Sequence, residues 1–153
     1  MHRGLGSAIS DDTIDIRPYE HGAFVGFDVT YEASELDPSR KGRGFWVYKF
    51  PCLLLHFAEH SFNCERVQPL GPGRVRLTRW FWCDEARTRA LGIGAEQLME
   101  SSRQVMKEDL GICEAVQRNL EAGIYETGRM APSEEVGTIY FQRLVREALS
   151  GTE

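Results

Sequence analysis

Asp109 carries a carboxylate at a point of the sequence where a carboxylate needs a chemical reason. It lies between Ala95 and Gly123, a segment whose apolar side chains recur with the helical period. The stripe that would face a core is made of Leu98, Ser102, Val105, Asp109, Ile112, Cys113, Val116 and Leu120. A carboxylate on such a stripe is costly unless it is paired, hydrogen-bonded or bound to a metal ion. Asp109 is therefore the first candidate for a functional residue.

Three interpretations of Asp109 follow from the pattern alone. The carboxylate can be a ligand of a non-haem iron site that two histidines complete. It can form an ion pair across the core with Arg79, Arg74 or a histidine. The helix can also be rotated, so that the carboxylate is solvated. The pattern leaves all three open.

The histidines and cysteines do not form a known metal motif. His56 and His60 resemble the zinc-protease pair in spacing, but that motif needs a helix and a glutamate directly after the first histidine. In an extended chain the two histidines lie about 13 Å apart, which favours surface or supporting roles. No cysteine lies within three residues of another, which favours small buried thiols in a reducing compartment. The four are Cys52, Cys64, Cys83 and Cys113.

Aromatic side chains gather in the predicted strands. They are expected mainly in a core or an interface, or alternatively in the wall of a pocket for a flat apolar substrate. The most prominent are Phe45, Trp46, Trp80, Phe81 and Trp82. The pocket that we predict on this basis is lined by Phe45, Trp46, Leu55, Phe81, Val105 and Ile112.

The elements that would position these residues are strands followed by helices. Period-two alternation and β-branched or aromatic content predict strands at 13–17, 23–31, 45–50, 52–58, 62–70 and 74–83. The nearly apolar 52–58 is typical of a strand covered on both faces, and Gly71-Pro72-Gly73 predicts an antiparallel hairpin. Residues 32–44 are expected to form an exposed loop that could serve as a lid, and 86–94 a linker with a short helical turn.

Two helices are predicted after the strands. The first spans 95–123 and contains Gly111, where a kink or close packing would explain the glycine. The second spans 136–149, with Ser133 as its N-cap and Glu134 and Glu135 in its first turn. The simplest architecture is α+β, with the sheet curled round the long helix and Asp109 pointing into a ligand cavity between them.

The bulk properties indicate a single domain over 1–153, with 1–12 frayed. Hydrophobic residues make up 42% and charged residues 27%, as in soluble globular proteins. The net charge of −5 disfavours a nucleic-acid surface. No apolar run is long enough for a membrane helix and the N-terminus has no signal-peptide core, so the cytoplasm is expected.

Several segments resemble one family, in order along the chain. The helical segment Glu108-Asp109 and Ile112-Cys113-Glu114-Ala115-Val116-Gln117-Arg118-Asn119-Leu120 is the most specific of them. The others are Phe50-Pro51-Cys52-Leu53-Leu54-Leu55-His56, Val67-Gln68-Pro69-Leu70-Gly71-Pro72-Gly73-Arg74, Gly128-Arg129-Met130, Glu134-Glu135 and Phe141-Gln142-Arg143. Over roughly 45–149 the sequence resembles the C-terminal part of the catalytic domain of Rieske-type non-haem iron oxygenases, the ring-hydroxylating large (alpha) subunits.

The resemblance implies a partial helix-grip fold and assigns Asp109 as the carboxylate ligand of a mononuclear Fe(II). The implied reaction is O2-dependent hydroxylation, dihydroxylation or demethylation of an aromatic or quaternary-amine substrate, with electrons delivered by a reductase or ferredoxin. It also implies a homo-oligomer, typically a trimer; the absence of a nucleic-acid or membrane partner is expected from the net charge and the short apolar runs instead.

The sequence departs from the family pattern at the cofactors. It has no Cys-x-His and Cys-x-x-His pair for a 2Fe-2S cluster, and His2 and His21 do not reproduce the iron-binding histidine pair. The chain is thus expected to be inactive alone, with a Rieske domain and histidine pair on another polypeptide. The alternatives are a truncated fragment and a non-enzymatic ligand-binding or assembly protein in which Asp109 anchors a hydrogen bond.

Overall fold

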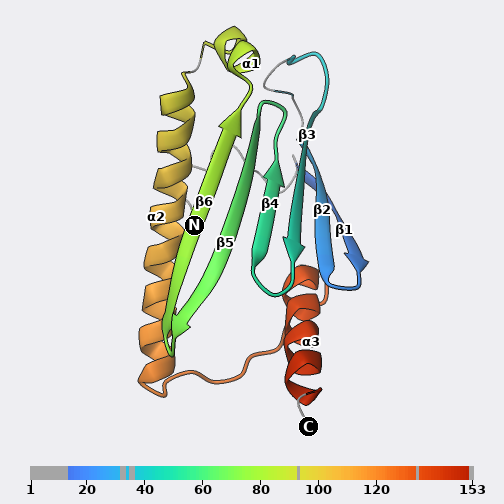
Figure 1. Cartoon of the computed structure of the whole chain (residues 1–153). Coiled ribbons are helices and arrows are strands. Elements are labelled where there is room, and N and C mark those ends of the chain that lie inside the picture. Colours follow the sequence, from blue (N-terminus) through green and yellow to red (C-terminus); the bar gives the residue numbers. More distant parts are fainter. Residues whose placement is uncertain (1–13, 32–33, 35–36, 93, 134, 152–153) are drawn as a thin grey trace.

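The computed structural model is a six-stranded antiparallel sheet with helices on one of its faces (Figure 1). The structure describes residues 14–31, 34, 37–92, 94–133 and 135–151, and the side chains from 19 onward within them. The strands are β1 Ile14–His21, β2 Phe24–Tyr31, β3 Gly42–Lys49, β4 Leu53–Phe57, β5 Ser61–Gly71 and β6 Arg74–Cys83. The helices are α1 Glu85–Ala90, α2 Ala95–Glu121 and α3 Val136–Ser150. The predicted α+β class is confirmed.

The sheet is a meander in which each strand pairs only with its neighbours along the chain, in the order β1 to β6. The predicted β5–β6 hairpin is present, and β6 has the predicted bounds. Gly71 and Gly73 in its turn have positive φ values of 148° and 66°. Only glycine adopts such values without a steric cost, so the Gly-Pro-Gly sequence fits the turn.

The two faces of the sheet differ. Both α2 and α3 lie on one face, which we call the helix face: Arg79 of β6 reaches α2, and Phe27 of β2 contacts α3. The opposite face, the open face, has no helix over it among the described residues. The core is small and lies under α3, where Val25, Val29 and Tyr140 are almost fully buried.

Helix α3 docks on β1 and β2, and its contacts include a close approach and a long-range hydrogen bond. Gly137 in its first turn faces the ring of Phe27, and the Tyr140 hydroxyl donates to the Gly22 carbonyl over 2.6 Å. A Cβ added at Gly137 would lie 2.5 Å from the Phe27 ring. The glycine therefore sets how close the helix can come to the sheet.

Gly137→Ala is expected to lower the free energy of unfolding by about 2 kcal/mol, because an overpacked contact displaces the helix or the ring. Gly111→Ala is the matched control: a Cβ there meets nothing within 4 Å among the described residues. That variant should gain about 0.5–1 kcal/mol, since alanine is the better helix former. Urea titration of both variants measures the difference. Equal stabilities would contradict the close approach of α3.

Helix α2 runs beside β6 along most of the length of the sheet (Figure 1). Its bounds agree with the prediction, but its apolar stripe is not the core-facing surface we expected: the helix has no fully buried residue. Ser102, Val105 and Asp109 are half-buried. Further along the same stripe, Ile112 and Val116 are 54% and 48% exposed. The helix lies at the edge of the sheet, and its C-terminal end reaches the β5–β6 turn, where Gln117 and Glu121 lie close to Gly73.

The predicted curling of the sheet round the long helix stays a prediction, because α2 is seen only beside β6. The nearly apolar β4 is not covered on both faces either: its first four residues are half-buried and Phe57 is exposed. The open face leaves one side of β4 uncovered. None of the helices in the described part of the chain combines the length and the apolar character that a membrane span requires.

Several predicted boundaries shift. Strand β3 begins at Gly42, inside the predicted loop. The predicted helical turn is α1, capped by the Asp84 side chain, which accepts from two backbone N–H groups. The predicted lid, residues 32–44, is bound to the rest of the structure at two of its described residues. The Ser34 hydroxyl and the Arg40 guanidinium both donate to the Glu59 carboxylate.

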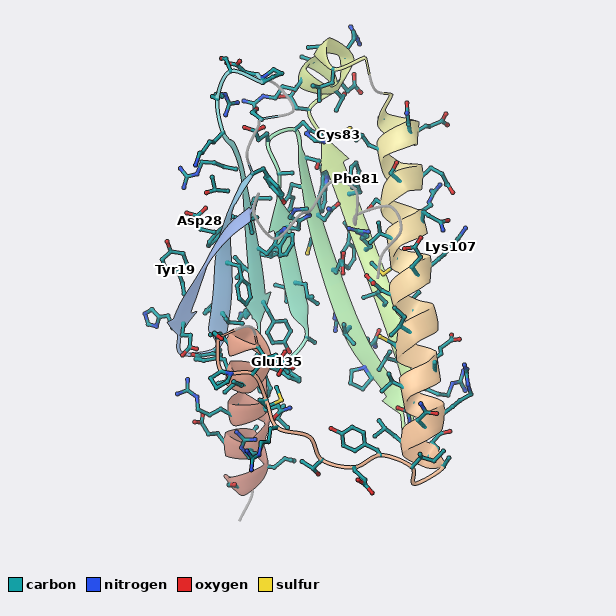
Figure 2. The ribbon with its side chains drawn as sticks, turned by 180° about the vertical axis from the view of Figure 1, so that it is seen from behind. Tyr19, Asp28, Phe81, Cys83, Lys107 and Glu135 are labelled. Carbon is teal, nitrogen blue, oxygen red and sulfur yellow. The ribbon has the colours of Figure 1, made fainter. Side chains whose placement is uncertain are left out.

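Ser133 is not the N-cap of α3. The helix begins after Glu135, and no side chain caps its first turn. The Glu135 carboxylate instead accepts from the Ala131 N–H over 2.6 Å and so braces the approach to the helix (Figure 2). Glu134 and the predicted frayed residues 1–12 lie outside the described residues.

Candidate functional site

Polar side chains gather on the helix face where β4, β5 and β6 lie side by side. His56 is paired with Asn63 across β4 and β5, and Glu65 is paired with Arg79 across β5 and β6. Alternate residues of a strand share a face, so all four side chains lie on the same side as α2. We call His56, Asn63, Glu65, Arg79 and Asp109 the polar cluster.

Arg79 is the link between the sheet and α2. Its Nε lies 3.0 Å from Glu65 Oε1, and its Nη1 donates to the Ser102 carbonyl of α2 over 3.2 Å. The Nε–Oε1 contact is an ion pair without hydrogen-bond geometry, since Nε is buried and has no hydrogen-bond partner. Arg79 thereby fixes the helix about two turns before Asp109.

The raised pKa of Glu65 indicates that Asp109 faces the polar cluster. Burial raises the pKa of Glu65, the Arg79 cation opposes this, and the negative charge of Asp109 raises the pKa further. Asp109 is itself half-buried. The carboxylate therefore lies within electrostatic reach of the Glu65–Arg79 pair, which favours the interpretations that turn it toward the sheet over the solvated one. Its role as a metal ligand stays a prediction.

His56 is held neutral. Burial, followed by the charges of Arg79 and His60, lowers its pKa from 6.5 to about 4. Its Nδ1 lies 3.3 Å from Asn63 Nδ2 and can accept from the amide, which places the ring proton on Nε2. Trp46 meets the imidazole edge-on, with ring centroids 5.4 Å apart. His56 is therefore a neutral supporting residue rather than a charged group.

The structure does not bring the six predicted pocket residues together. Trp46 and Phe81 lie on the helix face and Val105 is half-buried on α2. Phe45 and Leu55, each one residue away from a helix-face position, point to the open face, because side chains alternate along a strand. Ile112 is exposed on α2. Figure 2 shows Phe81 on β6, and Lys107 on the side of α2 away from the sheet.

The polar cluster offers part of a metal site rather than a complete one. Among the described residues, no three side chains of histidine, cysteine, aspartate or glutamate lie close enough to hold one metal ion. Glu65, a second carboxylate within electrostatic reach of Asp109, is ion-paired with Arg79, and this cation competes with a metal ion for the Glu65 carboxylate. The donor set in the described part of the chain therefore does not fit Fe(II) without further ligands.

Sequence reasoning missed Glu65 and Asn63. The register of the predicted hairpin could have identified them. Asn63 and Glu65 are two residues apart and so lie on one face of the sheet, where they are paired across the strands with Phe81 and Arg79. The pairing of His56 with Asn63 depends on the β4–β5 register, for which the sequence offers no comparable turn motif.

Comparison with known proteins bears on this arrangement. Residues 25–151 match the family model "Ring hydroxylating alpha subunit (catalytic domain)". Choline monooxygenase, chloroplastic, of Arabidopsis thaliana is 26% identical over 131 residues, which are 85% of this chain and 31% of that protein. The Amaranthus tricolor protein of the same name is 30% identical over 106 residues, 69% of this chain and 24% of that protein. No solved structure matches the chain significantly.

The match includes β2 to α3 and therefore the whole polar cluster. The chain spans less than a third of the length of these curated relatives. The resemblance inferred from the sequence is confirmed: the chain belongs to the family of ring-hydroxylating alpha subunits and corresponds to part of their catalytic domain.

Proposed function

We propose that the chain forms the C-terminal part of the catalytic domain of a Rieske-type oxygenase and supplies Asp109 as the carboxylate ligand of its mononuclear iron. The observation that carries the proposal is the position of Asp109: it lies on the helix that the family model covers, half-buried, and its charge acts on the polar cluster. The chemistry of the bound iron would be O2-dependent hydroxylation.

The residues of this chain position that carboxylate. Arg79 ties α2 to β6 through the Ser102 carbonyl and neutralises Glu65, so that the Asp109 carboxylate faces a neutral ion pair rather than a bare second carboxylate. Two further ligands, by family resemblance histidines, come from residues outside the described set or from another polypeptide. In this proposal a reductase or ferredoxin supplies the electrons, and the substrate is an aromatic compound or a quaternary amine. The names of the relatives favour an amine.

Iron content tests the proposal. The isolated chain should bind almost no iron, since one carboxylate is a weak ligand set. The chain combined with a polypeptide that carries a histidine pair and a Rieske cluster should bind about one iron per chain. Asp109→Ala should lose this iron, whereas Glu108→Ala, one residue away on the same helix, should retain it. Mass spectrometry of the metal measures both variants.

Two results would contradict the proposal. Stoichiometric iron in the isolated chain would mean that the chain holds a complete site. Retention of iron by Asp109→Ala in the reconstituted complex would mean that Asp109 is not the ligand.

A non-enzymatic ligand-binding protein is the second candidate. The incomplete metal donor set among the described residues favours it. A bound ligand at 100 times its dissociation constant adds about 2.7 kcal/mol of stability, which a thermal shift detects. A shift with choline or a small aromatic compound that survives Asp109→Ala would favour a simple pocket. The cytoplasmic location stays a prediction, as both relatives are chloroplastic by name.

A further inference from the structure

The open face carries a row of aromatic rings. Phe45, Phe57, Phe62 and Trp82 are directly paired across β3, β4, β5 and β6. Successive ring centroids lie 6.4, 4.7 and 5.2 Å apart, and the last pair is stacked. Tyr19 of β1 meets Phe45 edge-on at 6.5 Å. We call these five residues the aromatic row.

Exposed cations lie on the same face, between the aromatic row and the β5–β6 turn. Lys49 and Arg66 flank Leu53 across three neighbouring strands, each four residues along its strand from the row. Arg76 and Arg74 continue toward the turn on β6. We call these four cations the basic band. At the rise of an extended strand, four residues separate the near edge of the band from the row by about 13 Å.

The charges of the chain are segregated by face. On the open face the described strand residues carry five cations against one anion, a net charge of +4, although the whole chain has a net charge of −5. The cations are the basic band and Arg43, and the anion is Asp28. On the other side of the sheet, α2 carries six carboxylates against three cations. The open face therefore attracts anionic groups in spite of the net charge.

Within the described part of the chain, the basic band is not neutralised. Arg43 is paired with Asp28 at 3.0 Å, and the other ion pairs between described residues involve arginines outside the band. The Lys49 ammonium lies 5.6 Å from the centre of the Phe24 ring, a contact that leaves its charge uncompensated. A local excess of one sign of charge raises the concentration of an oppositely charged partner at the surface.

The aromatic side chains of the open face are accessible to such a partner. Their exposed fractions range from 39% to 52% for Tyr19, Phe24, Phe45, Phe57, Trp80 and Trp82. At about 200 Å2 for each aromatic side chain, these residues present about 500 Å2 to solvent. An apolar patch of this size with a charged rim is typical of a protein–protein contact.

The aromatic row ends in a hollow at the β1–β2 edge. Tyr19, Phe45 and Phe57 line this shallow depression of about 490 Å3 beside the Asp28–Arg43 ion pair. Figure 2 shows Tyr19 and Asp28 together at this edge of the sheet. The hollow has apolar walls and room for a side chain of a partner.

We propose that the open face binds an acidic protein, whose carboxylates meet the basic band and whose apolar side chains cover the aromatic row. The contact combines charge complementarity with burial of apolar surface, the two components of a specific protein interface. The proposal does not depend on Asp109 as a metal ligand, because the polar cluster lies on the other side of the sheet.

The orientation of the rings favours carboxylates over the bases of a nucleic acid. Phe57, Phe62 and Trp82 lie against one another at 4.7 and 5.2 Å, with interplanar angles of 32° and 21°. The ring faces that they turn to one another are occupied, whereas a base needs a free face on which to stack. A ring edge carries partial positive charge and attracts a carboxylate oxygen. The rings and the basic band thus favour the same partner, an acidic polypeptide.

Fluorescence anisotropy with a labelled acidic peptide tests the proposal on the full chain. The probe has four glutamates, two glycines and three leucines in that order, so that its two halves can reach the band and the row. In about 50 mM salt it should bind with a Kd on the order of 10 μM, and about 300 mM salt should weaken binding about tenfold.

Variants locate the contact on the open face. Arg66→Gln with Arg76→Gln should weaken binding by about tenfold, since two charge contacts are lost. Trp82→Ser should weaken it by at least about fivefold, as truncation of an aromatic anchor does. Arg89→Gln with Arg118→Gln removes the same charge from exposed positions of α1 and α2 and should leave binding unchanged. Circular dichroism checks that each variant is folded.

Two further probes separate the acidic protein from other occupants. The same peptide with glutamine in place of glutamate should bind at least about tenfold more weakly, and a single-stranded oligothymidylate should bind more weakly than the acidic peptide. No binding of the acidic peptide, an equal loss in both arginine pairs, undiminished binding of the glutamine peptide or tighter binding of the oligothymidylate would each overturn the proposal. Self-association in sedimentation velocity that Arg66→Gln with Arg76→Gln abolishes would also overturn it, since a second copy would then occupy the face.

Discussion

Arg79→Met is expected to lower the free energy of unfolding by about 3 kcal/mol, because removal of one partner leaves the other charge of a buried pair uncompensated. Arg79 and Glu65 expose only 24% and 16% of their side chains. Without the cation, Glu65 and the like-charged Asp109 would face each other, and α2 would lose its bond from Arg79 to the Ser102 carbonyl. Urea titration at neutral pH measures the loss.

Two further variants define the origin of that loss. Arg76→Met removes an exposed arginine three residues away on β6, on the open face, and should change stability by less than about 0.5 kcal/mol. The double variant Arg79→Met with Glu65→Leu should be more stable than Arg79→Met alone, since it leaves no stranded partner of the pair. If Arg79→Met and Arg76→Met behaved alike, the polar cluster would not be an electrostatic unit.

Acidification is expected to remove about 2 kcal/mol of stability through His56 alone. The folded pKa of His56 is about 4, below its ordinary 6.5, so the unfolded chain binds the extra proton first. The contribution is fully present above about pH 6.5 and is lost as the pH falls through the window down to about 4. The full shift would correspond to about 3 kcal/mol, and we reduce it because the ring is partly exposed to screening solvent.

The difference between wild type and His56→Gln isolates this contribution. Glu65 acts in the opposite sense: its raised pKa lowers stability as the pH rises above its ordinary value, and it cancels in the difference. Between pH 7 and pH 4 the wild type should therefore lose about 2 kcal/mol more stability than His56→Gln. A constant difference would show that His56 is not neutralised by its surroundings.

The sequence was sufficient for those elements that local patterns determine. Strand β6 and its turn follow from strict alternation and from Gly71-Pro72-Gly73, and the long helix from its period. Asp109 could be singled out from the sequence alone, because a carboxylate on an apolar stripe is unusual. The direction in which it points was then correct in outline, toward the sheet.

Tertiary placement was beyond the sequence. An apolar stripe predicts burial but not what covers it, which is why Ile112 and Val116 were expected in a core and are exposed. Aromatic content likewise did not distinguish Phe45 from Trp46, although the pleat places them on opposite faces. Ser133 had the side chain of an N-cap, but α3 begins only after Glu135.

The meander order of the sheet has a consequence for how the chain folds. Every strand pairs with its neighbour along the sequence, so the whole sheet can form from short loop closures, and low contact order favours rapid folding. The hydrogen bond from Tyr140 to Gly22 is of the opposite kind, since it joins residues 118 positions apart. Closure of that long loop is the slow entropic step. The sheet is thus expected to form first and to provide the surface on which α3 docks last.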